Sequence, residues 1–420
     1  MTAGAQDVPA VPAALQIPTR RVGAGWITAL VVVHVGINIG FFAPIQVLLG
    51  LHAQQLDASQ KNAILSLVTG VGAAVSLVAN PLFGALSDRS TSRYGRRIPW
   101  VFCGTICAAL ALLLMSTAQT VSMLVLGWAL MQAAGNAALA AIFAAIPDKV
   151  PVEQRGVVGG LVALGQTMGS LIGAVIGMVA AQDLVFGYAI VATAVALCSI
   201  PYVMMRKDVP LPKGALEPLK FREFVKSFWI NPVKHKDFGW AWLTRFMLYL
   251  GCQLCLVYLL YFLQDAVRYP DPAQGVLVLT AVYAFCVIFS SVISGKLSDK
   301  DGQRKKYVII SSVIVAAAAL TLSLASTFPV AIAAAVLLGI GFGSYLAVDF
   351  ALLTQVLPFA DSRGKDLGVI NIANSLPQVV APLIAWLSVT WFGGYPTLFI
   401  ISVIISLVGA VLVRQIKSVP

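Results

Sequence analysis

The chain has 420 residues, of which 59% are hydrophobic and only 11% are charged. A soluble domain carries roughly 25% charged residues, so this composition excludes a water-soluble globular fold. The net charge of +11 does not indicate a nucleic-acid-binding protein either, because Lys and Arg stand in short groups between long apolar runs instead of gathering on one surface.

Twelve apolar runs are long enough to cross the ~30 Å hydrocarbon layer as helices. We predict spans at residues 23–46, 62–86, 98–117, 121–146, 157–181, 184–205, 238–263, 274–297, 307–326, 329–356, 367–391 and 395–413. The prediction is an all-α membrane protein with six-helix bundles at 23–205 and 238–413. Residues 1–22 are expected to form a disordered tail, 206–237 a polar cytoplasmic linker and 414–420 a second tail.

The basic residues test this map, because Lys and Arg stay on the cytoplasmic side of short loops. Of the 28 Lys and Arg, 25 fall in the tails and the even-numbered loops, Lys61 and Arg268 fall in odd-numbered loops, and Arg245 falls within a span. The bias places both termini in the cytoplasm and predicts a multi-pass protein of the cytoplasmic membrane. All six cysteines lie in apolar runs, so we expect no disulfide framework and no metal site.

The two halves of the chain repeat each other. Gly84, Leu86, Asp88 and Arg89 follow the second span, and Gly295, Leu297, Asp299 and Lys300 follow the eighth, 295 − 84 = 211 residues later. Arg155-Gly156 after the fourth span and Arg363-Gly364 after the tenth repeat at 364 − 156 = 208. Two six-helix halves that repeat at nearly the same spacing are typical of transporters built from parallel repeats.

At these residues the sequence resembles the major facilitator superfamily, whose loops after helices two and eight read G-x-L-x-D-R-x-G-R-R. The first copy has four extra residues before Gly95, and this longer loop resembles the glycoside-pentoside-hexuronide symporters and the related sucrose/proton symporters. The stretch from Gly364 to Gln378 is similar to the same group. The resemblance implies a secondary transporter that works by alternating access.

The resemblance also implies a cytoplasmic gate in the basic loops. Asp88 ends the second span beside several guanidinium groups, and it is placed to accept from the N-terminal amides of a helix in the other half. In the resembled family such a latch holds the outward-open state; the alternative is that these charges only anchor the topology. The expected gate residues are Asp88, Arg89, Arg93, Arg96, Arg97, Asp299 and Arg304.

Three ionisable residues lie inside predicted spans, where burial of a charge costs at least ~2.5 kcal/mol and such groups usually pair or face a cavity. They are His34 in span one, Arg245 in span seven and Asp349 in span ten. Arg245 and Asp349 both lie 7 residues from the cytoplasmic ends of their predicted spans, roughly 10 Å deep at 1.5 Å per residue, and are expected to be able to meet. His34 lies slightly deeper.

Polar side chains recur every four residues along spans one, four, seven and ten, which line the central cavity in the resembled superfamily. Trp128 extends the stripe of span four and is expected to offer a ring on which a sugar stacks. The predicted substrate-binding residues are Asn38, Trp128, Gln132, Asn136, Tyr249, Gln253, Tyr345, Asn371, Asn374 and Gln378. Interhelical hydrogen bonding is the alternative role for each amide.

We hypothesise that Asp349 takes up and releases the proton that drives transport, that Arg245 favours its ionised form until protonation or substrate separates them, and that His34 is the second candidate. The alternatives are a static Arg245–Asp349 pair and a hydrogen-bonded interior histidine. Four glycines in span five, Gly165, Gly169, Gly173 and Gly177, predict close packing where the two halves rock.

The favoured function is proton-coupled symport of a small polar solute, with a sugar or glycoside preferred. The alternatives are a proton-coupled antiporter that exports a drug or metabolite, and a non-transporting receptor or scaffold with a transporter fold. No acidic residue precedes Asp88 in span two, which disfavours sodium coupling. Enzyme motifs such as a Walker loop, HExxH and GxSxG are missing, so we expect no enzymatic activity, no cofactor and no nucleic-acid partner. The expected partners are the solute and the lipid bilayer, and we expect a monomer.

Overall fold

The computed structural model describes residues 18–205, 208–212, 214, 235–356 and 363–417, and every regular element in these residues is helical. The helices of the N-half (18–205) are α1 (Ala24–Ala43), η2 (Pro44–Leu48), α2 (Leu49–Leu56), α3 (Lys61–Asp88), α4 (Ile98–Ser116), α5 (Val121–Lys149), α6 (Val152–Val179) and α7 (Leu184–Met204). Those of the C-half (235–417) are α9 (Lys236–Leu256), α10 (Leu259–Asp265), α11 (Pro272–Asp301), α12 (Arg304–Ser323), α13 (Phe328–Val356), α14 (Arg363–Trp391), α15 (Tyr395–Leu412) and the short η3 (Val413–Gln415). Most of the two predicted tails and of the linker lies outside the described residues.

The prediction of twelve membrane-crossing helices is confirmed. Eleven helices are long and apolar enough to cross a membrane, and α9 with α10 forms a twelfth span that bends by 40°. The first span differs from its prediction, because the helix continues past residue 46 to Leu56 through the π-helical turn η2. Two polar residues of η2 and α2 are bonded to neighbouring segments: Gln46 donates to Ser170 at 2.9 Å, and a ring nitrogen of His52 lies 2.8 Å from the Ala118 carbonyl oxygen.

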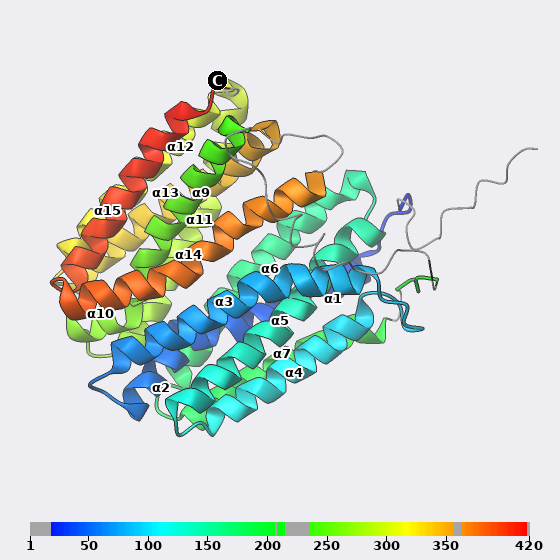
Figure 1. Cartoon of the computed structure of the whole chain (residues 1–420), viewed down its shortest axis with the longest axis horizontal. Helices are drawn as coiled ribbons and strands as arrows, with labels where there is room; N and C mark the ends of the chain where they lie inside the picture. Colours follow the sequence, from blue (N-terminus) through cyan, green and yellow to red (C-terminus); the bar gives the residue numbers. More distant parts are fainter. Residues whose placement is uncertain (1–17, 206–207, 213, 215–234, 357–362, 418–420) are drawn as a thin grey trace, which may run out of the picture.

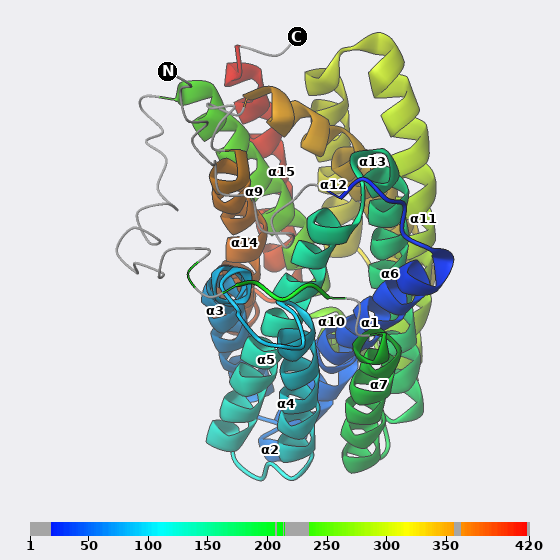
Figure 2. The same ribbon diagram turned by 90° about the vertical axis from the view of Figure 1, so that its right-hand side faces the viewer.

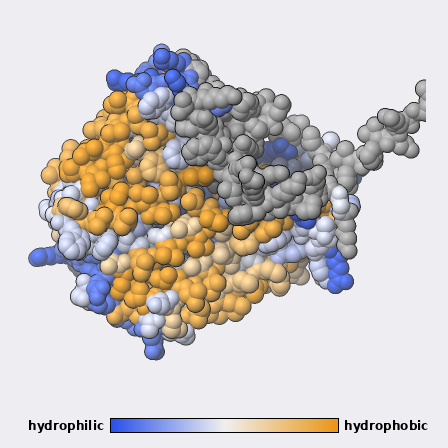
Figure 3. Space-filling view, viewed as in Figure 1, coloured by the Kyte–Doolittle hydropathy of each residue, from blue (hydrophilic) through white to orange (hydrophobic). Residues whose placement is uncertain are grey.

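The helices form two bundles that meet along two pairs of helices. In Figure 1 the bundles come together near α2 and α10 and diverge toward the opposite end, and α3 lies beside α14. Figure 2 shows that α6 and α11 form the second meeting line. The surface in Figure 3 is apolar over both bundles, with hydrophilic residues at the ends, as a protein surrounded by lipid requires.

One end of the molecule is held shut by hydrogen bonds between the halves, and we call it the closed end. The Lys61 ammonium donates to Asp265 at 2.6 Å and lies 4.8 Å from the Tyr261 ring centre. The hydroxyl of Tyr261 donates to the Gly50 carbonyl at 2.8 Å, and that of Tyr258 donates to the Asn62 carbonyl at 2.6 Å. The opposite end carries the arginine-rich loop after α3, and we call it the basic end.

The Lys61–Asp265 ion pair is expected to keep the closed end shut. Because both side chains are partly exposed, with 14% and 34% of their surfaces accessible, the pair contributes only about 0.5–1 kcal/mol. A cysteine introduced by Ser66→Cys lies between the halves and reports their opening by its reaction with an impermeant maleimide. Asp265→Asn should therefore raise this labelling rate by about two- to fivefold.

The matched control for this measurement is Tyr395→Phe. It removes a second hydrogen bond to Asp265, at 2.9 Å, that lies within the C-half. The labelling rate should then stay unchanged in a background without native cysteines. Equal acceleration by both substitutions would show that the ion pair does not act between the halves.

The glycine stripe of α6 packs within the N-half, which corrects the expectation that it lies where the two halves rock. A Cβ atom at Gly169 would lie 2.5 Å from the Asn38 Cβ, and one at Gly173 would lie 2.8 Å from the Ala43 backbone nitrogen. Both neighbours belong to α1. The stripe therefore lets α1 and α6 approach closely. Helix α6 also contacts α11 of the C-half, but the glycine stripe does not face that contact.

Gly169→Ala should lower the free energy of unfolding by about 2 kcal/mol, because the added methyl group meets a rigid backbone-proximal atom that cannot move aside. Gly159→Ala in the same helix is the control, since no atom lies within 4 Å of the position its Cβ would take. Unfolding in mixed detergent micelles, followed by tryptophan fluorescence, compares the two. Equal stability of the variants would mean that α1 and α6 are packed less tightly than described.

Candidate functional site

A buried charge pair joins α9 to α13 in the C-half. The Arg245 guanidinium donates through Nη1 to Asp349, and through Nε to the side-chain oxygen of Asn374 on α14. Arg245 is 8% exposed and Asp349 5%. The sequence-based prediction that these two residues meet is confirmed, and Asn374 joins them to a third helix.

Two tyrosines complete the surroundings of this pair. The Tyr345 hydroxyl donates to the second carboxylate oxygen of Asp349 at 2.6 Å, and the Arg245 guanidinium carbon lies 5.2 Å from the Tyr249 ring centre. The two tyrosine rings meet edge to face at 6.0 Å. Both oxygens of Asp349 are therefore bonded, and the net charge of the pair is zero. We call Arg245, Tyr249, Tyr345, Asp349 and Asn374 the ion-pair cluster.

The remaining predicted substrate-binding residues of the C-half stand on α9 and α14, two of the helices that carry this cluster. Gln253 is one turn beyond Tyr249 on α9 and is partly buried, whereas Gln378, one turn beyond Asn374 on α14, is exposed. Asn371 is on α14, but its side chain lies outside the description. The structure therefore brings together five of the predicted residues from three helices.

The polar stripe of α5 faces α3 inside the N-half. Asn136 donates to the Gln132 side-chain oxygen at 3.2 Å and accepts from Asn80 of α3, also at 3.2 Å. Gln132 and Asn136 are 6% and 4% exposed. Asn136 therefore bonds α5 to α3, which is the alternative role that the spacing left open, and Gln132 is bonded within α5.

In the structure described, Trp128 does not expose the ring surface on which a sugar was expected to stack. The residue is fully buried, and a Cβ atom at Gly72 of α3 would lie 2.1 Å from its indole nitrogen. The four-residue spacing correctly put Trp128 and Gln132 on one helix face. That face meets the neighbouring helix because Gly72 leaves space for the ring.

His34 and Asn38 stand on α1 and face α6, in the half of the molecule that does not hold the ion-pair cluster. The Asn38 side chain donates to the His34 carbonyl at 2.8 Å, so it is bonded within its own helix. The His34 ring meets Phe143 of α5 edge to face at 5.4 Å. The contacts of the His34 ring therefore lie within the N-half.

The arginines of the basic end are bonded inside the N-half. Arg97 donates to Asp88 at 2.6 Å and to Asp148 at 2.8 Å, and Arg96 lies 2.7 Å from Asp148. Burial lowers the pKa of Arg97, but Asp148 and Asp88 more than offset it, so this pKa lies above its ordinary value. The carboxylate of Asp208, after α7, accepts from the backbone nitrogen of Ile98 at 3.1 Å and thus caps α4.

This network differs in part from the predicted gate. Arg89 donates to the Ala85 carbonyl at 3.1 Å, and Arg93 to the neighbouring Tyr94 hydroxyl at 2.7 Å. In the C-half, Asp299 stands in the last turn of α11 with its side chain outside the description, and Arg304 begins α12. Sequence reasoning missed Asp148 and Asp208. The signal was available, because both carboxylates stand near the same ends of predicted spans as the clustered arginines, which need partners there.

Comparison with known proteins decides the family. A sequence profile described as the Major Facilitator Superfamily matches residues 25–280 and 242–418. The chain belongs to this superfamily. It is 27% identical over 141 residues to the uncharacterised MFS-type transporter YfiU of Bacillus subtilis, and 33% identical over 136 residues to the uncharacterised MFS-type transporter C18.02 of Schizosaccharomyces pombe. These matches cover 33% and 31% of this chain, and only 27% and 30% of the relatives' length.

Solved structures of the superfamily share the fold. The nucleoside transporter NupG has a TM-score of 0.75 at 13% identity, with 93% of this chain and 100% of that chain covered. A bacterial homologue of the human lysosomal transporter Spinster, crystallised inward-facing and unoccupied, has a TM-score of 0.72 at 14% identity, covering 93% of this chain and 97% of the other. These relatives and neighbours are named as transporters and not as enzymes, and the match to the superfamily together with the long apolar helices indicates a multi-pass membrane protein.

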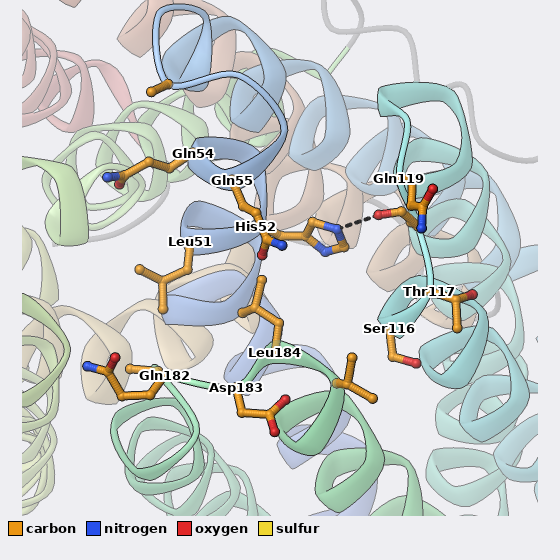
Figure 4. A pocket seen from close by; sticks show the side chains of 14 residues that line it. Leu51, His52, Gln54, Gln55, Ser116, Thr117, Gln119, Gln182, Asp183 and Leu184 are labelled. Atoms are coloured by element: carbon orange, nitrogen blue, oxygen red, sulfur yellow. Dashed lines mark hydrogen bonds between the residues drawn. The ribbon is translucent and has the colours of Figure 1, made fainter.

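A pocket of about 880 Å³ opens at the closed end of this superfamily member, away from the ion-pair cluster. It lies between α2, the loop from α4 to α5 and the loop from α6 to α7, with glutamine side chains around it (Figure 4). The His52 ring at its base is held by the Ala118 carbonyl. None of the predicted site residues lines this pocket, so we assign the candidate site to the ion-pair cluster.

Proposed function

We propose that this chain is a proton-coupled secondary transporter that imports a small polar solute, with a sugar or glycoside as the favoured substrate. The observation that supports this proposal is the ion-pair cluster. A buried charge within a membrane span is costly, and such residues are typical of proton and solute pathways. Because Arg245 and Asp349 balance each other, adding one proton to Asp349 changes the cluster from neutral to positive.

Protonation of Asp349 is the step that we assign to coupling. While Asp349 is ionised, its bond from Arg245 holds α13 against α9, and the bond from Tyr345, on α13 itself, fixes the carboxylate. A proton on one carboxylate oxygen removes the charge that Arg245 faces, and the guanidinium then needs another acceptor. An oxygen atom of the solute, arriving beside Asn374, supplies that acceptor. In this scheme proton and solute each favour binding of the other, which is the thermodynamic requirement of symport.

Helix α14 offers a route from the cluster to the contact between the halves. Asn374 accepts from Arg245, and eight residues further along α14 the Pro382 carbonyl accepts from Ser66 of α3 at 2.7 Å. Pro377 and Pro382 interrupt the hydrogen-bond ladder of α14, so this helix can bend between the two contacts. A change at the cluster thereby alters the helix that joins the two halves.

The excess of Lys and Arg supports a cytoplasmic location for the basic end, in the cell membrane. With that orientation the closed end faces outside, and the structure is an inward-facing state. The pairs at the closed end must then separate, and the halves approach at the basic end, before an external solute can enter.

Uptake into proteoliposomes tests the proposal. The panel consists of radiolabelled glucose, xylose, melibiose, sucrose, uridine and a dipeptide, each measured with and without an imposed inside-alkaline pH gradient. We expect one sugar or glycoside to accumulate only with the gradient, and to exchange in counterflow without it. Accumulation under the opposite gradient would establish the antiporter, and no uptake or exchange of any solute would favour the receptor or scaffold.

A further inference from the structure

The internal repeat holds at the level of side-chain contacts, so it can be used to compare the two halves position by position. Contacts between spans one and six recur 211 residues later between spans seven and twelve: Gly36 meets Cys198 as Met247 meets Gly409, and Gly40 meets Val195 as Gly251 meets Ser406. By this offset His34 stands where Arg245 stands in the C-half, since 34 + 211 = 245. His34 is therefore the N-half counterpart of the buried arginine.

The helix beside each residue is also equivalent. Arg245 lies against α14 at Asn374, and the offset of 208 that relates spans five and eleven places Gln166 at the equivalent position, since 166 + 208 = 374. The preceding residue, Gly165, adjoins the histidine, because a Cβ there would lie 3.5 Å from the His34 ring carbon Cδ2. The N-half thus repeats the framework of the ion-pair cluster.

What the N-half lacks is the acidic partner. The offset of 208 that relates spans four and ten puts Ala141 at the position of Asp349, since 141 + 208 = 349. Its neighbours Ala140 and Ile142 are apolar as well, so a shift of one residue would not supply a carboxylate. Arg245 finds its partner within the protein, but its counterpart His34 does not.

His34 is accordingly left with unused hydrogen-bonding capacity. The residue is 1% exposed, and both of its ring nitrogens are buried without a hydrogen-bond partner in the described structure. Buried polar groups are almost always bonded, so two unpartnered atoms on one ring indicate that a partner comes from outside the chain. The ring is covered by Phe143, which is itself 46% exposed, so a rotation of one accessible side chain uncovers it.

We propose that His34 is a solute-binding residue of the N-half. A hydroxyl group of the transported solute bonds to His34 at the place equivalent to the one that the Asp349 carboxylate occupies beside Arg245 in the C-half. The inference rests on the proposed transport function and specifies its substrate class as a neutral polyhydroxylated solute. An uncharged imidazole carries one donor and one acceptor. A hydroxyl group can bond either ring nitrogen, because it both donates and accepts, whereas a carboxylate offers only acceptors and an ammonium group only donors.

The experiment measures which hydroxyl group His34 contacts. The probe is the sugar or glycoside that shows counterflow in the uptake panel, together with its series of monodeoxy analogues, and binding is measured on the full-length protein in detergent. In the unmodified protein one analogue should bind about tenfold more weakly than the parent, the loss expected for one hydrogen bond of 1.4 kcal/mol. In His34→Ala the parent and this analogue should bind equally.

Two variants serve as controls. His34→Gln keeps a donor and an acceptor and should retain part of the difference between parent and analogue. His52→Ala replaces the other buried histidine of the first span, which is bonded to the Ala118 carbonyl, and should leave the full difference. An unchanged tenfold difference in His34→Ala would overturn the inference.

A measurement without any substitution at His34 covers the case in which these variants do not fold. Saturating solute should protect His34, but not His52, from diethyl pyrocarbonate, and Phe143→Ala should accelerate the reaction of His34 in the absence of solute. No protection of His34, or no reaction even in Phe143→Ala, would refute its exposure to the solute. If no member of the panel is transported, the proposed function fails; if transport occurs and His34 is unaffected, only the inference fails.

Discussion

Asp349→Asn should abolish uphill accumulation of the solute while leaving exchange across the membrane intact. A pH difference of one unit supports about a tenfold accumulation at one proton per solute, and the variant should reach a ratio of one. Asparagine keeps the shape of the side chain, can still accept from Arg245 through its one oxygen and can donate from its NH2 group to the Tyr345 hydroxyl oxygen, but it has no proton to release. Parallel measurements of gradient-driven uptake and counterflow in proteoliposomes separate the two activities.

The controls for this experiment distinguish coupling from folding. Asp57→Asn alters a carboxylate in the loop before α3 that accepts from Ser59 within its own turn, at 2.8 Å and 2.6 Å, so full accumulation should remain. Asp349→Asn also leaves Arg245 as a buried cation without a counter-charge, which is destabilising. The double variant Arg245→Gln/Asp349→Asn removes both charges, and it should regain stability without regaining accumulation. Full accumulation in Asp349→Asn would reduce the pair to a static brace between α9 and α13.

The ion-pair cluster was largely predictable from the sequence, because membrane depth restricts where a charge can find a partner. Arg245 and Asp349 lie at similar depths in their spans. Pairing with each other therefore lowers the free-energy cost of burying either charge. Tyr249 and Tyr345 followed from the same helices, one turn away, since residues four apart share a face. The twelve spans were predictable for a related reason, because length and apolar composition are nearly sufficient to define a membrane helix.

The N-half site was less predictable, because periodicity identifies a shared helix face but not the neighbour which that face meets. The stripe of Trp128, Gln132 and Asn136 is real, yet it meets α3, where Gly72 admits the indole ring. Which helix lies opposite depends on small residues far away in the sequence. The same limit explains why Asp148 and Asp208 were missed, since they reach the arginines through the tertiary arrangement of α4, α5 and the segment after α7.

Arg97→Ala should have the largest effect on stability of any substitution at the basic end. The Arg97 side chain is 3% exposed, joins the end of α3 to the end of α5 through two carboxylates, and also donates to the Ser87 hydroxyl. Truncation leaves Arg96 as the remaining cation beside the Asp148 carboxylate, and breaking a buried pair costs about 3 kcal/mol. The free energy of unfolding in mixed detergent micelles, followed by tryptophan fluorescence, should fall by that amount.

Arg93→Ala is the matched control, because this arginine belongs to the same loop but is bonded to the adjacent exposed Tyr94. A surface contact of that kind should change the unfolding free energy by less than about 0.5 kcal/mol. Arg97→Lys should recover only part of the loss, since one ammonium group cannot reproduce the planar donors that reach Asp88, Asp148 and Ser87 together. Equal stabilities of Arg97→Ala and Arg93→Ala would mean that the network does not brace the N-half. The loop arginines would then be left with the alternative role named above, which is to anchor the membrane topology.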